Sequence, residues 1–382
     1  MALDLQMLGD KLKRYREQFQ LSHQELSEAT GISADVLSQF ETGQREPTGD
    51  EILVLADFFR CDYRFFISNE KLAAFEQTET LFRMDGDQLS REDRWAIQEF
   101  LFLCECEEFL MQELHPAERT PFVFSKQGTF YKGHGESAAE SLRRHLGYQP
   151  HAVNRDVFQD FRQIGLHVFR RSLENSNISG LFIKHPYAGK CVLVNDSEDP
   201  FRQRFTAAHE AGHAILDDDK DVVVSFARWD HSDLSEVRAN TFASRFLMPQ
   251  EFLRSLPAPG QWPADKVQEW CLKLMVNPEP LSYALKDADI ISDTQRDAIR
   301  VMKVPQGLKP DAELPASLAP RSRERGKQLL KKGLSAAYAG LCLDAYDRGL
   351  ISAGRMAEML LVNHGELEET LEVFGGTRHH GD

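Results

Sequence analysis

The chain has 382 residues, which is enough for two or three domains, each with its own hydrophobic core. It has no run of about 18 apolar residues, so no membrane-spanning helix is expected, and its six cysteines are too few for a disulfide scaffold. The net charge of −15 disfavours nucleic-acid binding by the surface as a whole but allows one local binding face.

The first 70 residues predict a set of short helices. Ser22, with Glu25 three residues later, forms the capping box that begins a helix, and Gly31 is typical of the tight turn that ends one. Ser33 then caps a further helix that runs to about Glu41. A helix, a short turn with glycine and a second helix make up a helix-turn-helix motif.

This segment resembles the DNA-binding domain of the Cro/lambda-repressor or XRE (xenobiotic-response-element) type. The matching positions are Gln24, Leu26, Ala29, Gly31, Ile32, Ser33, Ser38, Glu41, Gly43 and Pro47. The resemblance implies that the helix from Ser33 to about Glu41 enters the major groove of double-stranded DNA. The DNA-contacting residues that it implies are Gln24, Ser33, Asp35, Ser38, Gln39, Gln44 and Arg45.

The charge of this segment departs from that pattern. Residues 1–69 contain seven Lys or Arg and twelve Asp or Glu, so the segment carries a net charge of −5. Lys and Arg supply most of the non-specific affinity for DNA, and Asp35 would repel phosphate or accept from a cytosine amino group. The alternative is a small helical module for dimerisation or for docking a protein partner.

Residues 71–119 predict a helical arm that joins two domains and offers a surface for a homodimer. Ser90 with Asp93 resembles another helix start. Cys104 and Cys106 are two residues apart and so point to different sides of a helix. We therefore expect ordinary buried thiols there, and no metal or redox site.

Beyond residue 120 the pattern changes to helices mixed with strands. Residues 136–148 predict an amphipathic helix, and a strand is expected around 166–169. The apolar segments 178–184 and 190–195 predict two further strands, after which a helix begins near 199–202. Helices packed on a small sheet form an α+β domain.

The helix after these strands carries the sequence HEAGH. His209 and His213 are one turn apart on one helix face, so their imidazoles can share one Zn²⁺ ion. Glu210 lies at the edge of that face, within reach of a metal-bound water, and His-Glu-x-x-His is the zincin signature. Such a site needs a third protein ligand. Glu236, 23 residues after His213 on an expected return helix, supplies a carboxylate.

Some positions near the motif leave alternatives open. Asp217, four residues after His213, is an alternative third ligand, although its short side chain lies one turn further along. The acidic run from residue 217 to residue 221 is expected to be a solvated helix end at the rim of the site. Gly212 is costly in mid-helix, and we expect it to let another backbone approach closely. Candidates for a second group that stabilises the oxyanion are His231, Tyr187 and Tyr283.

The segments RQRFTAAHEAGHAIL and SEVRANTFASRFLMP resemble the ImmA/IrrE family of metallopeptidases. Many members of that family join a helix-turn-helix domain to the peptidase domain. The resemblance implies a gluzincin-like site in which His209, His213 and Glu236 bind Zn²⁺ and Glu210 is the general base. It also implies site-specific cleavage of a helix-turn-helix repressor or an antitoxin-like regulator, in phage, mobile-element or stress-response control.

The last third of the chain predicts mainly helices between proline-rich breaks. Within it, residues 321–332 carry six Lys or Arg and one Glu. This segment is either the solvated start of a helix or a surface for nucleic acid or an acidic partner. We therefore expect a multidomain chain: an all-α helix-turn-helix domain at 1–70, the helical arm at 71–119, an α+β zincin-like metallopeptidase domain at 120–255 and a helical region at 256–382.

The sequence as a whole predicts a zinc-dependent endopeptidase that cleaves a protein partner. The alternative is a DNA-binding transcription regulator or antitoxin whose peptidase-like domain senses a signal or binds a partner without cleavage. The complete ligand set and Glu210 favour the first function. Because the N-terminus lacks the basic-then-apolar order of a signal peptide, we expect the protein in the cytoplasm, away from membranes.

Overall fold

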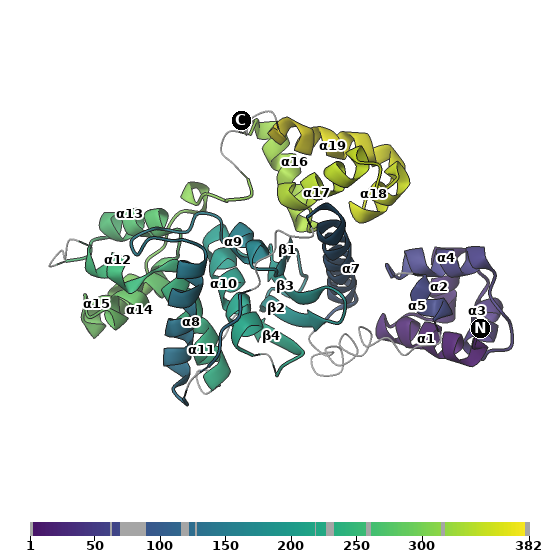
Figure 1. The fold of residues 1–382 in the computed structure, drawn as a ribbon, viewed down its shortest axis with the longest axis horizontal. Coiled ribbons are helices and arrows are strands. Elements are labelled where there is room, and N and C mark those ends of the chain that lie inside the picture. The colour runs from purple at the N-terminus through teal and green to yellow at the C-terminus, as the bar shows by residue number, and fades with distance from the viewer. Residues whose placement is uncertain are drawn as a thin grey trace. The chain divides into compact units, whose positions relative to one another are not determined.

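The computed structural model describes residues 3–61, 63–68, 89–115, 122–126, 128–217, 219–226, 233–256, 261–314 and 318–378. They fall into two units, the first within 1–105 and 185–187 and the second within 106–184 and 188–382 (Figure 1). The first unit is helical, and the second combines a four-stranded sheet with many helices. The predicted combination of helix-turn-helix, α+β and helical C-terminal regions is thereby confirmed. None of the described helices is long and apolar enough to cross a membrane.

The first unit contains the predicted helix-turn-helix. Its helices are α1 (Leu5–Gln18), α2 (His23–Thr30), α3 (Ala34–Glu41), α4 (Gly49–Phe58) and α5 (Arg64–Ile67). The predicted capping box is present, because Ser22 Oγ accepts from the Glu25 amide at 3.2 Å and Glu25 Oε2 accepts from the Ser22 amide at 2.8 Å. Gly31 ends α2 with a φ of 74°, a left-handed conformation that favours glycine.

A shielded ion pair and stacked aromatic rings hold the first unit together. Arg16 of α1 donates from Nε and Nη2 to the two carboxylate oxygens of Glu41 in α3, at 2.6 and 2.9 Å. Such bidentate pairs are the strong ones, and Glu41 is buried. Phe19 stacks on Trp95 with ring centroids 4.1 Å apart, which adds the first turns of α7 (Arg91–Leu114) to this core.

Helix α7 begins where the sequence predicts. Ser90 Oγ accepts from the Asp93 amide at 3.1 Å, and Asp93 Oδ2 accepts from the Ser90 amide at 3.2 Å. Cys104 and Cys106 are both buried, and neither forms a disulfide. The other parts of the predicted arm, 71–88 and 116–119, lie outside the described residues.

The sheet of the second unit has the strand order β1-β3-β2-β4. Its strands are β1 (His167–Arg171), β2 (Ile178–His185), β3 (Gly189–Asn195) and β4 (Val222–Phe226). β1 and β3 are parallel, whereas β2 and β4 are antiparallel. The sequence predicts the first three strands but not β4, the strand that pairs with β2 at one edge of the sheet.

Helices pack around this sheet and share one core with it. The first four are α8 (Tyr131–His145), α9 (Val157–Gln163), α10 (Pro200–Leu216) and α11 (Leu234–Leu247). α11 packs against α8 and α10, and α10 packs against β3. They are followed by α12 (Gln250–Arg254), α13 (Ala264–Leu274), α14 (Pro278–Asp287), α15 (Asp293–Arg300) and the 3₁₀ helix η1 (Gln306–Leu308). The buried apolar cluster runs from Ala138 to Val304, so α13 to α15 belong to the same core.

The last four helices share two local features with the N-terminal ones. They are α16 (Pro320–Lys331), α17 (Ala336–Asp347), α18 (Ala353–Met359) and α19 (His364–Arg378). Ser352 caps α18 as Ser22 caps α2, with its Oγ accepting from the Arg355 amide at 3.1 Å. Leu361 follows α18 with a φ of 50°, as Gly31 follows α2 with a φ of 74°. Each of these left-handed residues lies nine positions after its capping serine.

The C-terminal arrangement differs from the N-terminal one in charge. Helix α19, which follows α18 as α3 follows α2, exposes four glutamates in its first three turns: Glu366, Glu368, Glu369 and Glu372. Arg325, in the basic segment 321–332, pairs with Glu369, so one cation of that segment is bound within the chain. Because phosphates repel carboxylates, we do not expect α19 to enter a DNA groove.

One buried histidine with two carboxylate partners makes the stability of the second unit sensitive to pH. Nδ1 of His167 lies 2.6 Å from Glu107 Oε2, and Nε2 lies 3.1 Å from Glu108 Oε2. Burial lowers the pKa of His167, but the two carboxylates outweigh burial and raise the pKa to about 9. In the unfolded chain a histidine has a pKa of about 6.5, so the folded state binds this proton more tightly.

We predict that the second unit loses stability as the pH rises from 6.5 to 9. The stabilisation is complete below the unfolded pKa and disappears as the pH passes the folded one, a change of at most about 3 kcal/mol. Thermal unfolding followed by circular dichroism across this pH range should show a smaller fall in Tm for His167→Gln than for wild type. The control His151→Gln, which changes an exposed histidine, should keep the wild-type slope. An unchanged slope in His167→Gln contradicts the prediction.

Candidate metal centre

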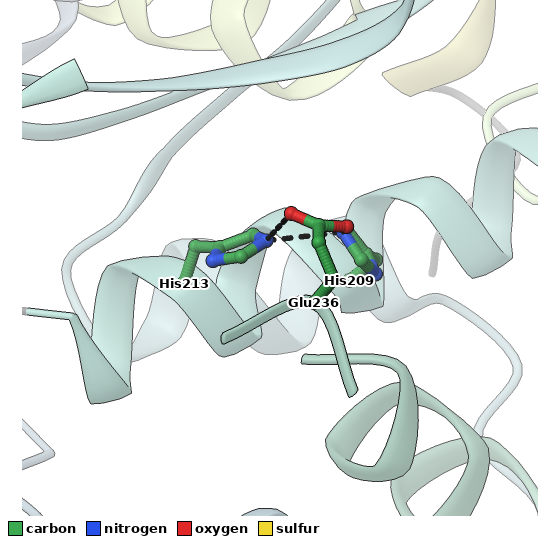
Figure 2. Close-up of side chains that lie close together, drawn as sticks. All are labelled: His209, His213 and Glu236. Carbon is green, nitrogen blue, oxygen red and sulfur yellow. Dashed lines mark hydrogen bonds and ion pairs between the residues drawn. The ribbon is translucent and has the colours of Figure 1, made fainter. Parts of the chain in front are cut away.

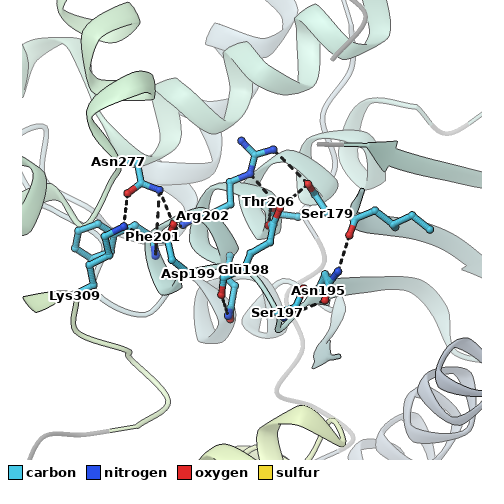
Figure 3. A network of polar contacts seen from close by, with 12 residues as sticks. Ser179, Asn195, Ser197, Glu198, Asp199, Phe201, Arg202, Thr206, Asn277 and Lys309 are labelled. Atoms are coloured by element: carbon cyan, nitrogen blue, oxygen red, sulfur yellow. Dashed lines mark hydrogen bonds and ion pairs between the residues drawn. The ribbon is translucent and has the colours of Figure 1, made fainter. Parts of the chain in front are cut away.

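Helix α10 carries both histidines, and its start is held by several contacts. Asp199 Oδ1 accepts from the Phe201 and Arg202 amides at 3.0 and 3.2 Å, which caps the helix. Asn277 Nδ2 and Lys309 Nζ also donate to the Asp199 carboxylate, at 3.1 and 2.9 Å (Figure 3). These contacts fix where α10 begins and therefore where its later turns lie.

The close approach expected at Gly212 is present. A Cβ at this position would lie 3.2 Å from Ala239 Cα and 3.2 Å from Phe242 Cδ1. The backbone of α11 therefore passes directly against α10, with no side chain of residue 212 between them. This contact brings the first turn of α11, which carries Glu236, to the face of α10 that carries His209 and His213.

The three predicted ligands converge in this region (Figure 2). Glu236 Oε2 lies 3.3 Å from His209 Nε2, and Glu236 Oε1 lies 3.1 Å from His213 Nε2. The two Nε2 atoms are 3.1 Å apart. Both histidines are buried, and Glu236 is partly buried. The chain thus brings together donor atoms from residues that are 23 and 27 positions apart.

The protonation states in this cluster favour a bound cation. Burial lowers the pKa of His209, so its imidazole is neutral at pH 7. Burial raises the pKa of Glu236, but the two imidazoles outweigh burial and hold that pKa well below its ordinary range. A neutral imidazole and an ionised carboxylate are the protonation states in which these side chains bind a metal ion, because metal ligands must be deprotonated.

The spacing of the donor atoms also fits a metal ion. Ligands at about 2.0–2.1 Å from Zn²⁺ in a tetrahedral site are about 3.3–3.4 Å apart, and the three observed separations are 3.1–3.3 Å. Two imidazoles and one carboxylate are a donor set that leaves a fourth position for water or substrate. The residues present therefore fit a divalent metal of the zinc type.

Two further side chains hold the histidines, and the sequence analysis did not assign them this role. Nδ1 of His209 lies 3.0 Å from Asn240 Oδ1, and Nδ1 of His213 lies 2.6 Å from Asp217 Oδ2. Donation from each Nδ1–H leaves both Nε2 atoms as ligands, the usual arrangement around a metal. Asn240 is four residues after Glu236 on α11, a spacing that could have indicated this role.

Asp217 is therefore not a solvated helix end, as the sequence predicts for the acidic run. It is 1 % exposed, and its second oxygen pairs with Arg238 of α11. The alternative of Asp217 as third ligand is also not favoured by the structure, because its carboxylate is bonded to the far side of the His213 ring. The sequence misjudges this residue because its partner Arg238 comes from another helix. Asp219, two positions later, is exposed as expected.

Glu210 lies on the sheet side of α10 and is fully buried. Burial raises its pKa to about 8, against the lowering effects of His213 and of the Ser225 hydroxyl on β4. Ser225 is near enough to affect this pKa, but neither group completes a hydrogen bond of regular geometry within the described residues. A carboxyl group with a pKa near neutrality and without a fixed partner can accept and release a proton.

The candidates for a second oxyanion donor stay predictions. Tyr187 is 51 % exposed in the turn between β2 and β3. Tyr283 on α14 accepts from Arg300 Nη1 at 3.3 Å, and the guanidinium of Arg296 lies over its ring. His231 lies outside the described residues.

The predicted DNA-contacting residues gather on and beside α3. Those with exposed side chains are Gln24, Ser33, Asp35, Ser38, Gln39 and Gln44. Ser33 Oγ also caps α3, and Gln24 Nε2 donates to Glu28 at 3.0 Å. Arg45 is half-buried, since its guanidinium lies 5.4 Å from the centre of the Phe40 ring and 3.0 Å from Glu51. The face is accessible but carries little positive charge.

Comparisons with known families agree with this geometry. Residues 12–66 match the family model of helix-turn-helix domains, and residues 161–276 match that of the IrrE N-terminal-like peptidase domain. No match to a curated protein was found. The fold and the matches define a class of protein in which a helix-turn-helix domain precedes a peptidase domain. Both resemblances in the sequence, to XRE-type domains and to ImmA/IrrE peptidases, are thereby confirmed.

We predict that Asp217→Asn weakens the binding of Zn²⁺ by about 10- to 100-fold, as loss of such second-sphere partners does elsewhere. The asparagine amide has no negative charge, so it cannot replace the carboxylate that accepts from His213 Nδ1–H and pairs with Arg238. Competition against a chromophoric chelator measures the affinity. Asp219→Asn is the matched control from the same acidic run and should bind Zn²⁺ as wild type does. Equal affinities of Asp217→Asn and wild type would show that Asp217 does not hold His213 for the metal.

Proposed function

We propose that this chain is a zinc-dependent endopeptidase that cleaves a protein partner at a specific site. The observation that carries the proposal is the convergence of His209, His213 and Glu236 with the buried carboxyl group of Glu210 beside them. The match to a peptidase family and the match to a helix-turn-helix family support a regulator with a peptidase-like domain.

The proposed roles follow from the contacts of each residue. His209 and His213 would bind Zn²⁺ through Nε2, because each Nδ1 is engaged by Asn240 or Asp217. When bound, the ion supplies Lewis-acid polarisation of the scissile carbonyl and makes a water molecule more acidic. Glu210 accepts the proton of the attacking water and passes it to the leaving amine. Its burial keeps bulk water from competing for that proton.

The proposed substrate is a helix-turn-helix repressor or an antitoxin-like regulator. A chain that carries its own helix-turn-helix unit has a surface of the size and shape that recognises either DNA or another regulator. The net charge of −5 over residues 1–69 favours a protein target, because phosphate binding depends on Lys and Arg. A cytoplasmic location and a homodimer remain predictions of the same proposal.

We predict that Glu210→Gln keeps the metal but lowers cleavage by about 100- to 10,000-fold, the usual contribution of a general base. Zinc content is measured by plasma mass spectrometry. Cleavage is measured with a fluorescence-quenched peptide library and with the regulator encoded beside the gene. Glu251→Gln, which changes an exposed glutamate of α12, is the control and should behave as wild type. Bound zinc without any Glu210-dependent cleavage contradicts the peptidase function.

The second candidate function is a DNA-binding regulator whose peptidase-like domain binds a partner without cleavage. It is favoured by the exposed face of α3 and by the helix-turn-helix match at residues 12–66. Both functions are compatible in one chain, since the residues concerned lie in different units.

For this second function we predict that Gln39→Ala weakens binding to double-stranded DNA from the upstream region of its own gene by at least about fivefold. Arg45→Ala should remove one phosphate contact and so reduce by about one the slope of the logarithm of the DNA-binding constant against the logarithm of the salt concentration. Fluorescence anisotropy at several salt concentrations measures both. Glu17→Gln, on the exposed side of α1, is the control. DNA binding that is unchanged in the Gln39 and Arg45 variants would exclude α3 as the reading helix.

A further inference from the structure

Strand β2 contains a β-bulge where it packs against α10. Ile178 pairs with Phe226 of β4, but the next pair is Gly180 with Ser225, so Ser179 is an additional residue on β2. Bulges bend a strand and redirect its side chains, and they are frequent next to active sites.

Because of the bulge, two consecutive residues of β2 face the same helix region. Ser179 Oγ donates to Glu198 Oε1 at 2.7 Å, just before the start of α10 (Figure 3). A Cβ on Gly180 would lie 2.7 Å from Thr206 Cγ2 and 3.1 Å from Glu210 Cγ, both on α10. In a regular strand, neighbouring residues face opposite sides of the sheet, so the shared direction is a consequence of the bulge.

The polar groups around Ser179 fix the position of α10 over the bulge. Glu198 accepts from Ser179 Oγ and, at 3.2 Å, from Thr206 Oγ1. Arg202 donates to Ser179 Oγ at 3.3 Å, and its Nε lies 3.4 Å from Glu198 (Figure 3). Thr206 and Glu210 are one helical turn apart, so these contacts also fix the distance of Glu210 from β2.

At Gly180 the helix lies on the strand with no side chain in between. An added Cβ would also lie 2.8 Å from the carbonyl oxygen of Leu193, a backbone atom of β3 that no side-chain rotation can move. Glu210 is fully buried, and its carboxylate oxygens complete no regular hydrogen bond within the described residues. Packing against the backbone of β2, rather than a hydrogen bond, therefore holds this side chain.

We propose that Gly180, presented by the bulge at Ser179, is a positioning residue for the general base Glu210. Because residue 180 has no side chain, α10 can lie close to the sheet, and this distance sets the position of the Glu210 carboxyl group for proton transfer. None of the three atoms nearest to a Cβ on Gly180 belongs to a candidate metal ligand. This inference rests on the proposed peptidase function of Glu210.

The test is Gly180→Ala in the full chain loaded with Zn²⁺, with the best-cleaved peptide of the quenched library as the probe. We expect kcat to fall by about 10- to 100-fold, the effect of a small misplacement of a reacting group, with KM changed far less. Zinc content should stay at the wild-type level, since no ligand touches residue 180. Gly307→Ala is the matched control, because a Cβ there meets no atom within 4 Å.

A double-mutant cycle with Glu210→Gln separates positioning from general destabilisation. If Gly180 acts through Glu210, the alanine causes no further loss of the residual rate in the Glu210→Gln background. An equal loss in both backgrounds, or a wild-type kcat in Gly180→Ala, overturns the proposal. If Glu210→Gln itself cleaves at the wild-type rate, the proposed peptidase function fails instead, so the two failures are distinguishable.

Ser179→Ala provides a second variant in case Gly180→Ala does not fold, as judged by thermal unfolding. It adds no atom and removes only the hydroxyl that joins the bulge to Glu198 and Arg202. We expect kcat to fall by about 3- to 10-fold, the effect of one lost hydrogen bond, with zinc content unchanged. A wild-type kcat in this variant contradicts the proposal.

Discussion

The candidate metal centre depends on how closely α10 and α11 approach each other. At Gly212 the two helices meet with only 3.2 Å between a would-be Cβ and the Cα atom of Ala239. This contact sets Glu236 against the two histidines, and it also puts Arg238 and Asn240 of the same helix within reach of the groups behind them. Helix α10 therefore supplies two candidate ligands and, at its end, Asp217 beside His213, whereas α11 supplies the third candidate ligand and Asn240 beside His209.

The buried charges of the site are compensated, with one exception. Asp217 is paired with Arg238 and His213, and such pairing is what makes a buried charge tolerable. Glu210 has no comparable partner among the described residues, and burial raises its pKa to about 8. A buried carboxyl group whose oxygens complete no regular hydrogen bond among the described residues is costly for stability, which is typical of a group kept for its chemistry.

A serine-capped helix followed by a left-handed residue occurs near both ends of the chain, but the helices that follow expose different side chains. The outward side of α3 presents uncharged polar groups such as Ser38 and Gln39, whereas α19 presents Glu368 and Glu369. In both segments a serine caps the helix and a residue with positive φ, Gly31 or Leu361, follows it. The two ends therefore differ in the side chains that they expose and not in these local backbone features.

Features that depend on near neighbours in the chain could be predicted from the sequence. Helix starts at Ser22, Ser90 and Asp199 follow from caps that bond two to three residues ahead, and HEAGH on one helix face follows from the helical repeat. The convergence with Glu236 could be expected from the sequence because a return helix of suitable length was recognisable.

Features that depend on distant partners could not be predicted from the sequence, because they result from tertiary packing. β4 exists because it pairs with β2, and the bulge at Ser179 is defined only by the register between residues about 45 positions apart. The burial of Asp217 results from Arg238, which a separate helix brings to it. Sequence patterns report the preference of each segment for a conformation, whereas the surroundings of a side chain are set by the segments that pack on it, and these lie far away in the chain.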